Sequence, residues 1–182
     1  MTKNTDVADT ANTVYPSNDL AVGCNHILFT LGGQLTPNTV CSQSLVRFDP
    51  SSLAGRTIIS ATLTLTTQYV GSGIYPNNWY VLAVASNWSP STVTWNTVDN
   101  PSFEYYLDSD SIHAPPSTVG QTYDIDVTTT VQNWINGTFT NYGFQFTTNA
   151  HDTLSVISAD MFGFYNTENS VLNSPKLTVV YQ

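Results

Sequence analysis

The sequence predicts an all-β protein: a single jelly-roll-like antiparallel β-sandwich that carries one short α-helix. Apolar residues recur at every second position over most of the chain, which is the period of strands with one buried face. One segment has the period of a helix instead. The length of 182 residues suits one domain, and strands with one solvated face bury the other by packing sheet on sheet.

The clearest expected strand spans residues 58–67, where apolar residues alternate with Ser and Thr. Residues 176–181 alternate in the same way, and 79–85 form a near-continuous apolar run, which is typical of a central strand. Clusters of Gly, Pro and Asn separate these segments and predict turns. The expected strands are 26–31, 43–49, 58–67, 79–85, 121–125, 144–146, 154–158 and 176–181.

The helical segment follows Asp126. From Val127 to Ile135 the apolar residues are spaced by four, three and one positions, which places them on one face of a helix. Asp126 stands where a capping side chain accepts a bond from a free backbone N–H, and Gly137 stands where a left-handed residue ends a helix. We therefore expect a short helix at about Val127–Asn136.

The first residues differ in composition from the rest of the chain. Residues 1–14 are polar, and we expect a flexible or partner-ordered N-terminal arm there, followed by one sandwich domain over 15–182. The opening residues lack the apolar core of a signal peptide, which leaves open a removed leader or export without one. No apolar run is long enough to span a bilayer.

Charge is sparse and mostly negative. Charged residues make up 9% of the chain, against about 25% in an average soluble domain, and the formal net charge is −9. The four cations are scattered, whereas a nucleic-acid backbone requires clustered Lys and Arg. We therefore expect no nucleic-acid partner and no membrane insertion. The uncharged surface, rich in Thr and Asn, favours an extracellular or cell-surface location.

Cys24 and Cys41 allow two interpretations. In an oxidising compartment they could form a disulfide, which would stabilise the fold by about 3 kcal/mol through loop entropy. Alternatively they are two buried thiols, because spacing alone does not show that the Cα atoms are within reach. A metal site is not expected here, since His26 is the one further ligand nearby.

The chain has no motif of a familiar catalytic site: no Gly-x-Ser-x-Gly, no His-Glu-x-x-His and no phosphate-binding glycine loop. Asp124 and Asp126 lie on one strand face, but a helix cap at Asp126 and a solvated Asp124 explain them more simply. We therefore expect a protein that is not an enzyme and requires no cofactor.

A Ca²⁺ ion is the one cofactor that the sequence leaves possible. Asp108-Ser-Asp110-Ser resembles the opening of a calcium loop, but the glycine and the final carboxylate of that loop are missing. A simpler site of aspartates and backbone carbonyls at Asp108 and Asp110, or at Asp6, Asp9 and Asp19, stands beside the alternative of a solvated loop.

The aromatic residues fall into two groups. Trp88, Trp95 and Trp134 lie within apolar patterns and are expected in the core. A second group lies in a polar turn and at the entrance of a long polar loop, and sugar rings stack on such aromatic side chains while Asn amides bind their hydroxyls. The expected ligand-binding residues are Tyr75, Asn77, Trp79, Tyr105 and Tyr106.

Several stretches, taken in order, are similar to one known family. They are Leu45-Val-Arg47-Phe-Asp-Pro50, Trp88-Ser-Pro-Ser-Thr-Val-Thr-Trp95-Asn96, Val131-Gln-Asn-Trp134-Ile-Asn-Gly137, Asn141-Tyr-Gly-Phe144 and Ser174-Pro-Lys-Leu-Thr-Val-Val-Tyr181. Together they resemble the DNRLRE-type domains of secreted bacterial and archaeal proteins, which are related to alginate-binding-type carbohydrate-binding modules and to archaeal disaggregatase-related repeats. The resemblance covers roughly residues 40–182, and the Asp-Asn-Arg-Leu-Arg-Glu string itself is absent.

The resemblance implies a jelly roll, an extracellular location and non-catalytic attachment to glycans or cell surfaces. It also implies a framework role for Arg47 and for the tryptophans expected in the core, while Tyr75 and Trp79 lie outside that framework, as a variable ligand site would. A net charge of −9 repels a polyanion unless Ca²⁺ bridges the two. We therefore expect a neutral polysaccharide or cell-surface glycan as the partner.

A second function, of a different class, also fits the sequence. A sparsely charged domain with a polar arm could be a structural subunit of an extracellular coat, fibre or filament. It would assemble with copies of itself by lending the N-terminal arm to the sheet edge of a neighbour.

Overall fold

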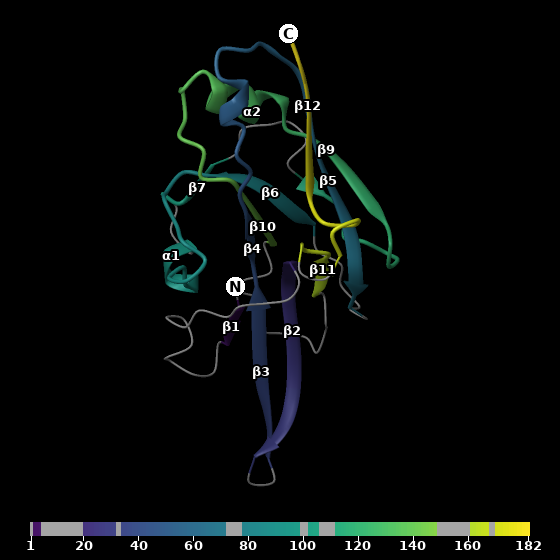
Figure 1. Ribbon diagram of the computed structural model, residues 1–182. Coiled ribbons are helices and arrows are strands. Elements are labelled where there is room, and N and C mark those ends of the chain that lie inside the picture. Colours follow the sequence, from purple (N-terminus) through teal and green to yellow (C-terminus); the bar gives the residue numbers. More distant parts are fainter. Residues whose placement is uncertain are drawn as a thin grey trace.

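The computed structural model describes residues 2–4, 20–31, 34–71, 78–98, 102–105, 112–148, 161–167 and 170–182, with the backbone alone for 2–4, 25–31, 34–40 and 104–105. In this part of the chain, antiparallel strands form two sheets that pack face to face, as the sequence predicts (Figure 1). The elements are β1 (Thr2–Asn4), β2 (Leu20–Leu31), β3 (Gln34–Ser42), β4 (Ser44–Val46), the 3₁₀ turn η2 (Ser51–Leu53), β5 (Ile58–Val70), β6 (Trp79–Val84), α1 (Trp95–Val98), β7 (Glu104–Tyr105), β8 (Ile112–His113), β9 (Thr122–Asp126), α2 (Thr128–Ile135), β10 (Phe144–Thr148), β11 (Phe162–Phe164) and β12 (Lys176–Tyr181).

The larger sheet is built around β5. Its strand order over the described residues is β1-β3-β2-β11-β5-β12, and β9 also pairs with β5. The smaller sheet has the order β4-β10-β6-β7, with β8 also paired to β6. Most strands that are paired within a sheet are not consecutive in the sequence, which is the crossing topology expected of a jelly roll.

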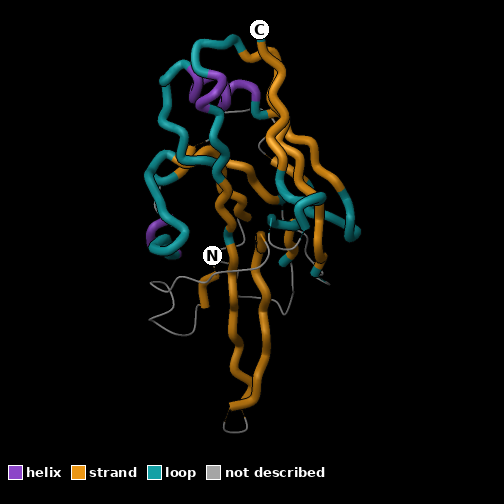
Figure 2. Tube along the Cα trace, in the orientation of Figure 1, coloured by secondary structure: helices purple, strands orange, loops and turns teal. Residues whose placement is uncertain are grey.

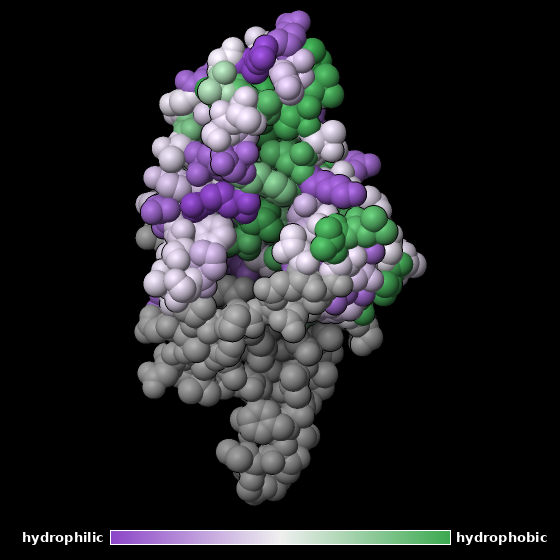
Figure 3. Space-filling model, viewed as in Figure 1, coloured by the Kyte–Doolittle hydropathy of each residue, from purple (hydrophilic) through white to green (hydrophobic). Residues whose placement is uncertain are grey.

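The core lies between the two sheets, because each sheet turns its alternating apolar face inward. On β5 the residues Ala61, Leu63 and Leu65 are buried, while Thr62 and Thr64 between them are partly exposed. Phe144 and Phe146 of β10 face them from the smaller sheet as members of the same core cluster. Partly buried apolar residues pack against this core, and Figure 3 shows an apolar stripe on one face of the molecule.

Helix α2 covers one end of the sandwich, close to the end of β12 (Figure 2). The Asp126 carboxylate accepts the Thr128 hydroxyl at 2.6 Å and the Thr128 backbone N–H at 2.9 Å, and these hydrogen bonds hold the pKa of Asp126 below its usual value. Gly137 follows the helix with a φ of +71°, the left-handed conformation expected for it. The side chain of Trp134 packs on Phe144 with a ring-centroid distance of 4.9 Å. The predicted helix is confirmed to within one residue at each end.

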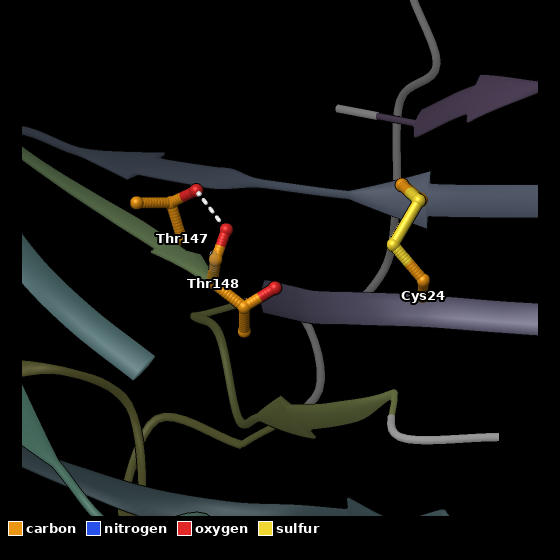
Figure 4. Close-up of a disulfide and its surroundings, with 4 residues drawn as sticks. Cys24, Thr147 and Thr148 are labelled. Atoms are coloured by element: carbon orange, nitrogen blue, oxygen red, sulfur yellow. Dashed lines mark hydrogen bonds between the residues drawn. A yellow bond between two sulfur atoms is a disulfide. The ribbon is translucent and has the colours of Figure 1, made fainter. Parts of the chain in front are cut away.

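Strands β2 and β3 form a long hairpin that extends beyond the rest of the sandwich (Figure 1). Cys24 and Cys41 face each other across it and form a disulfide with a Cα–Cα distance of 4.0 Å (Figure 4). The disulfide packs against Trp95 of α1 in a small buried cluster. At the nearby end of β10, the Thr147 hydroxyl donates to the carbonyl oxygen of Thr148.

Several elements were not expected from the sequence. Strand β3 contains Pro37 and reads as a turn-rich segment, and β7, β8 and β11 are too short to show a period. Within the expected N-terminal arm, residues 2–4 form strand β1 and pair with Val40–Ser42 of the same chain. The rest of that arm and the expected strand 154–158 lie outside the described residues. No described helix has the length and apolar character needed to cross a membrane.

Candidate functional site

The structure describes two of the five sequence-predicted ligand residues, Trp79 in β6 and Tyr105 in the neighbouring β7. Tyr75, Asn77 and Tyr106 lie outside the described residues, and Tyr105 is described by its backbone, in β7. Strand β7 pairs with Ala83 and Val84 at one end of β6, and β8 pairs with Trp79 and Tyr80 at the other. The two described residues, Trp79 and Tyr105, therefore lie at opposite ends of β6.

Trp79 belongs to the core, which corrects its assignment as a ligand-binding residue. Its exposed fraction is 0%, and its ring packs against Phe164 at a centroid distance of 5.0 Å and edge-on against Tyr123 at 5.2 Å. Its indole N–H donates to the carbonyl oxygen of Ala114 at 3.0 Å. With no face open to solvent, Trp79 cannot stack on a sugar, and it anchors the segment after β8 instead.

A different aromatic group reaches the surface at the opposite end of β6. Trp88 follows β6, Tyr142 precedes β10 and Arg47 follows β4; we call these three residues the Arg47 cluster. They meet because β4, β10 and β6 are neighbours, in a register that sets Phe144 opposite both Val46 and Ala83. The cluster therefore lies where two strands of the smaller sheet end and a third begins.

The cluster is a stack of one cation and two rings. The Arg47 guanidinium carbon lies 4.9 Å from the ring centroid of Trp88 and 5.7 Å from that of Tyr142. Arg47 Nη2 also donates to the carbonyl oxygen of Trp88 at 3.3 Å, and the Trp88 indole N–H donates to the carbonyl oxygen of Tyr142 at 2.6 Å. Contacts of this kind between cations and aromatic rings contribute about 0.5–1 kcal/mol each at exposed sites.

The two rings of the cluster are partly buried, whereas its arginine is exposed to solvent. Trp88 and Tyr142 are partly buried against an apolar group on the outer side of the smaller sheet, which includes Val84 and Phe103. The Arg47 side chain is exposed. Within the described part of the chain, Arg47 has no carboxylate partner. Among the described residues, the Trp88 carbonyl is the one hydrogen-bond acceptor of this guanidinium, which leaves its other N–H groups for a ligand.

The backbone beneath Tyr142 is held rigidly. Gly143 has a φ of +89°, and a Cβ atom there would collide with the carbonyl oxygen of Val46. The Gly143 N–H donates to Asn141 Oδ1 at 3.0 Å, and Asn141 Nδ2 donates to the carbonyl oxygen of Phe48 at 2.7 Å. A glycine is therefore required at this position, and it allows Tyr142 to sit close beside the end of β4.

The acidic residues that the structure describes have structural partners. Asp124 Oδ1 accepts the Thr64 hydroxyl at 2.7 Å, and Asp126 Oδ1 accepts the backbone N–H of Thr128, the first residue of α2, at 2.9 Å. In the described ranges there is no group of three His, Cys, Asp or Glu residues that could hold a metal ion. The proposed calcium ligands Asp108 and Asp110 lie outside those ranges.

Sequence reasoning assigned Trp88 to the core and missed the Arg47 cluster, whose members are up to 95 positions apart. A local signal was present. Trp88 lies in Asn87-Trp88-Ser89-Pro90 and Tyr142 in Asn141-Tyr142-Gly143, so both aromatics are flanked by turn-forming residues. This is the signal that led to Trp79. The other two tryptophans are buried as expected, with exposed fractions of 1% for Trp95 and 7% for Trp134.

Comparison with protein families gives one match. The model of carbohydrate-binding module family 96 matches residues 25–181, which cover every strand from the hairpin to β12. No curated protein matches the chain.

Proposed function

The chain belongs to carbohydrate-binding module family 96, and from this we propose that it is a non-catalytic, extracellular module that binds a neutral glycan through the Arg47 cluster. Modules of this kind attach proteins to polysaccharides or cell-surface glycans and carry no catalytic residues of their own. The observation that supports the site is the exposed guanidinium of Arg47, which has no carboxylate partner among the described residues and stacks on two half-buried rings.

The chemistry of the cluster suits a sugar. Pyranose rings present apolar C–H faces that pack on aromatic rings, while their hydroxyl oxygens accept hydrogen bonds from N–H donors. Trp88 and Tyr142 provide the aromatic surface, and Arg47 provides donors in a fixed plane. Because the rings are held by the indole-to-carbonyl bond and by Gly143, little side-chain freedom is lost on binding.

The proposal of a neutral ligand rests on charge. A protein of net charge −9 repels a polyuronate at long range, and Arg47 is the one cation of the cluster. Hydroxyl groups of a neutral glycan accept from a guanidinium without that repulsion. Tyr75, Asn77, Tyr105 and Tyr106 remain proposed contacts that would extend the surface, and bound Ca²⁺ is not required.

Calorimetry with the full chain tests the proposal. We expect binding to at least one neutral polysaccharide in a panel of glucans, mannans, xylans and galactans, and Trp88→Ala or Tyr142→Ala should weaken that binding at least tenfold, or about 1.4 kcal/mol. Tyr181→Ala is the matched control, because Tyr181 is also an exposed aromatic beneath an arginine, with Arg56 5.5 Å from its ring centroid.

Three results would each contradict part of the proposal. Absence of binding to every polysaccharide in the panel would contradict the proposal that the Arg47 cluster binds a neutral glycan. Binding that survives both substitutions in the cluster would move the site to the loops around β6. Tighter binding to alginate than to every neutral polymer would overturn the neutral ligand while leaving the site in place.

An assembly role for the N-terminal arm is a second proposal. Strand β1 pairs with β3 of its own chain over three residues, from Thr2 opposite Ser42 to Asn4 opposite Val40. An arm that adds to this edge within one chain has the geometry to add to the same edge of a neighbour. Electron microscopy of the concentrated protein, with and without residues 1–14, tests this, and monodisperse particles in both samples would exclude it.

A further inference from the structure

The outer part of the β2–β3 hairpin has two edges on which the structure describes no further strand. Beyond the disulfide, seven residue pairs continue from Asn25 opposite Val40 to Leu31 opposite Gln34. On the outer edge of β2, strand β11 pairs no further than Val22, and on the outer edge of β3, β1 pairs no further than Val40. Past these points no strand that the structure describes lies on either edge, and the ribbon projects from the sandwich (Figure 2).

The composition of this ribbon is unusual for an exposed element. From Leu20 to Val46 the chain has no Lys, Arg, Asp or Glu, and most positions of β2 beyond Asn25 are apolar. A two-stranded hairpin by itself is marginally stable in water. Open, uncharged strand edges also offer unpaired N–H and C=O groups to another strand. The Cys24–Cys41 disulfide holds the base of the ribbon together but leaves its edges open.

The register shows which backbone groups point outward. In an antiparallel ladder, closely spaced Cα pairs are those whose N–H and C=O groups point away from each other. Cys24 and Cys41 form such a pair, at a Cα–Cα distance of 4.0 Å. Because the two classes of pair alternate, Leu28 opposite Pro37, four positions farther along, belongs to the same class. Leu28 and Pro37 therefore lie at positions whose backbone groups face the two outer edges.

Proline makes the two edges unequal. At position 37 the missing N–H is one that would have pointed outward, so Pro37 leaves the β2–β3 ladder intact and removes a donor from the middle of the β3 edge. Proline at such a position blocks the addition of a further strand. The β2 edge has no proline, and the outward-facing positions His26, Leu28 and Thr30 keep their N–H groups. One edge of the ribbon is thus closed to pairing and the other is open.

We propose that the open edge of β2 pairs with the same edge of a second copy of this chain, about a two-fold axis at Leu28. Antiparallel pairing then sets Leu28 opposite Leu28 of the second copy and His26 opposite Thr30. The pairing joins the two hairpins into one four-stranded ribbon with about six new backbone hydrogen bonds. Each copy contributes the same edge of β2 to this pairing, as an interface with two-fold symmetry requires.

Charge favours a second copy as the occupant. The acidic side chains that the structure describes, Asp49, Asp124 and Asp126, lie on the sandwich. The ribbon extends seven residues beyond the disulfide, about 24 Å at 3.4 Å per residue. Ionic screening acts over about 8–10 Å at physiological salt. Two copies that touch through their ribbons therefore keep these three described carboxylates of each copy beyond the range of strong repulsion.

The closed edge also limits the size of the assembly. If both edges could pair, each copy would bind two neighbours and a filament would grow. With Pro37 on one edge, pairing ends at two copies. This mode differs from assembly through the N-terminal arm, because it uses β2 and stops at a dimer.

Sedimentation of the full chain tests the proposal. We expect a dimer for the wild-type protein at micromolar concentrations and a monomer for Leu28→Pro, which removes the central outward N–H as Pro37 does on β3. Leu28→Thr is the matched control: it removes the same side chain but keeps the N–H, and should remain a dimer. Far-UV circular dichroism and the mass of the intact disulfide verify that each variant is folded.

A further variant tests whether Pro37 closes the β3 edge, because it should increase the size of the assembly rather than reduce it. Pro37→Thr restores the N–H on β3, and we expect species larger than a dimer. A wild-type protein that stays monomeric at 100 µM, roughly the upper end of a typical weak association, overturns the proposal, as does a folded Leu28→Pro variant that stays dimeric. A monomeric wild-type protein that co-sediments with neutral phosphatidylcholine vesicles would overturn it in favour of a lipid surface.

Discussion

Two tryptophans at opposite ends of strand β6 show how differently one kind of residue is used. Trp79 begins the strand and Trp88 follows it, and each donates its indole N–H to a backbone carbonyl, at 3.0 Å and 2.6 Å respectively. Trp79 has no exposed surface and is surrounded by aromatic rings. Trp88 is half-buried and lies beneath an arginine at the surface.

The two tryptophans differ in burial because of where each lies relative to strand β6 and to which side of that strand its side chain points. Trp79 and Val81 point to the same side of β6, the side that faces the larger sheet, so Trp79 is drawn into the core with Val81. Trp88 lies beyond the end of the strand, where the chain has left the sheet. An aromatic residue beside Asn therefore indicates a turn but does not reveal whether the ring is buried. The end of β6 near Trp79 provides stability, and the end near Trp88 offers a surface.

The largest expected effect comes from replacing the buried tryptophan. Trp79→Ala should destabilise the fold by about 3–5 kcal/mol, because it leaves a large cavity and removes one of the two hydrogen bonds that the Ala114 carbonyl accepts. Trp88→Ala should lower the free energy of unfolding by about half as much or less, since part of its ring is already solvated. Chemical denaturation of both variants measures the difference. Equal losses of stability would show that the two ends do not differ as described.

The next effect concerns the backbone under Tyr142. Gly143→Ala should destabilise by about 2–4 kcal/mol, because the left-handed φ costs about 1–2 kcal/mol and the Cβ also collides with Val46. Gly137→Ala is the control, because its φ is +71° but nothing lies within 4 Å of its Cβ position. It should lose about 1–2 kcal/mol. Gly143→Ala should also weaken glycan binding, whereas Gly137→Ala should leave it unchanged.

The smallest effect is a pH dependence at the Trp79 end. Burial raises the pKa of Tyr123 above 10.0, its ordinary value, and its hydroxyl donates to Ala114. Because folding raises the pKa of Tyr123, the neutral hydroxyl of this residue stabilises the folded protein. This stabilisation is fully present below the pKa of the tyrosine in the unfolded chain and is lost as the pH rises through its pKa in the folded protein. Because Tyr123 is partly exposed to solvent, we expect a change in the free energy of unfolding of less than about 1 kcal/mol.

Alkaline denaturation of the wild-type protein and Tyr123→Phe measures that loss. The wild-type protein should lose stability relative to Tyr123→Phe above about pH 10. Parallel stability curves for the two proteins from pH 8 to 11, a window of roughly one unit or more on each side of the tyrosine pKa, would contradict the assignment.

Much of the fold was predictable because a strand's period is a property of the local chain. The expected segments at 58–67, 79–85, 144–146 and 176–181 each contain or overlap a strand, and α2 ends at a glycine in the expected conformation. Strand β3 was not predictable from the spacing of apolar residues, since a proline such as Pro37 is typical of a turn. Only its pairing with β2 shows that this proline lies at an edge, where it costs the ladder nothing.

The sequence by itself determined the all-β class, the sandwich, the short helix and the low charge, from which we expect no nucleic-acid partner. Tertiary structure alone decided which aromatics face the core and which reach solvent, because that depends on the phase of each strand against the opposite sheet. It also brought Arg47, Trp88 and Tyr142 together from three separate strand ends. Alternation along a chain shows that one face is buried, but long-range pairing decides which residues share a surface.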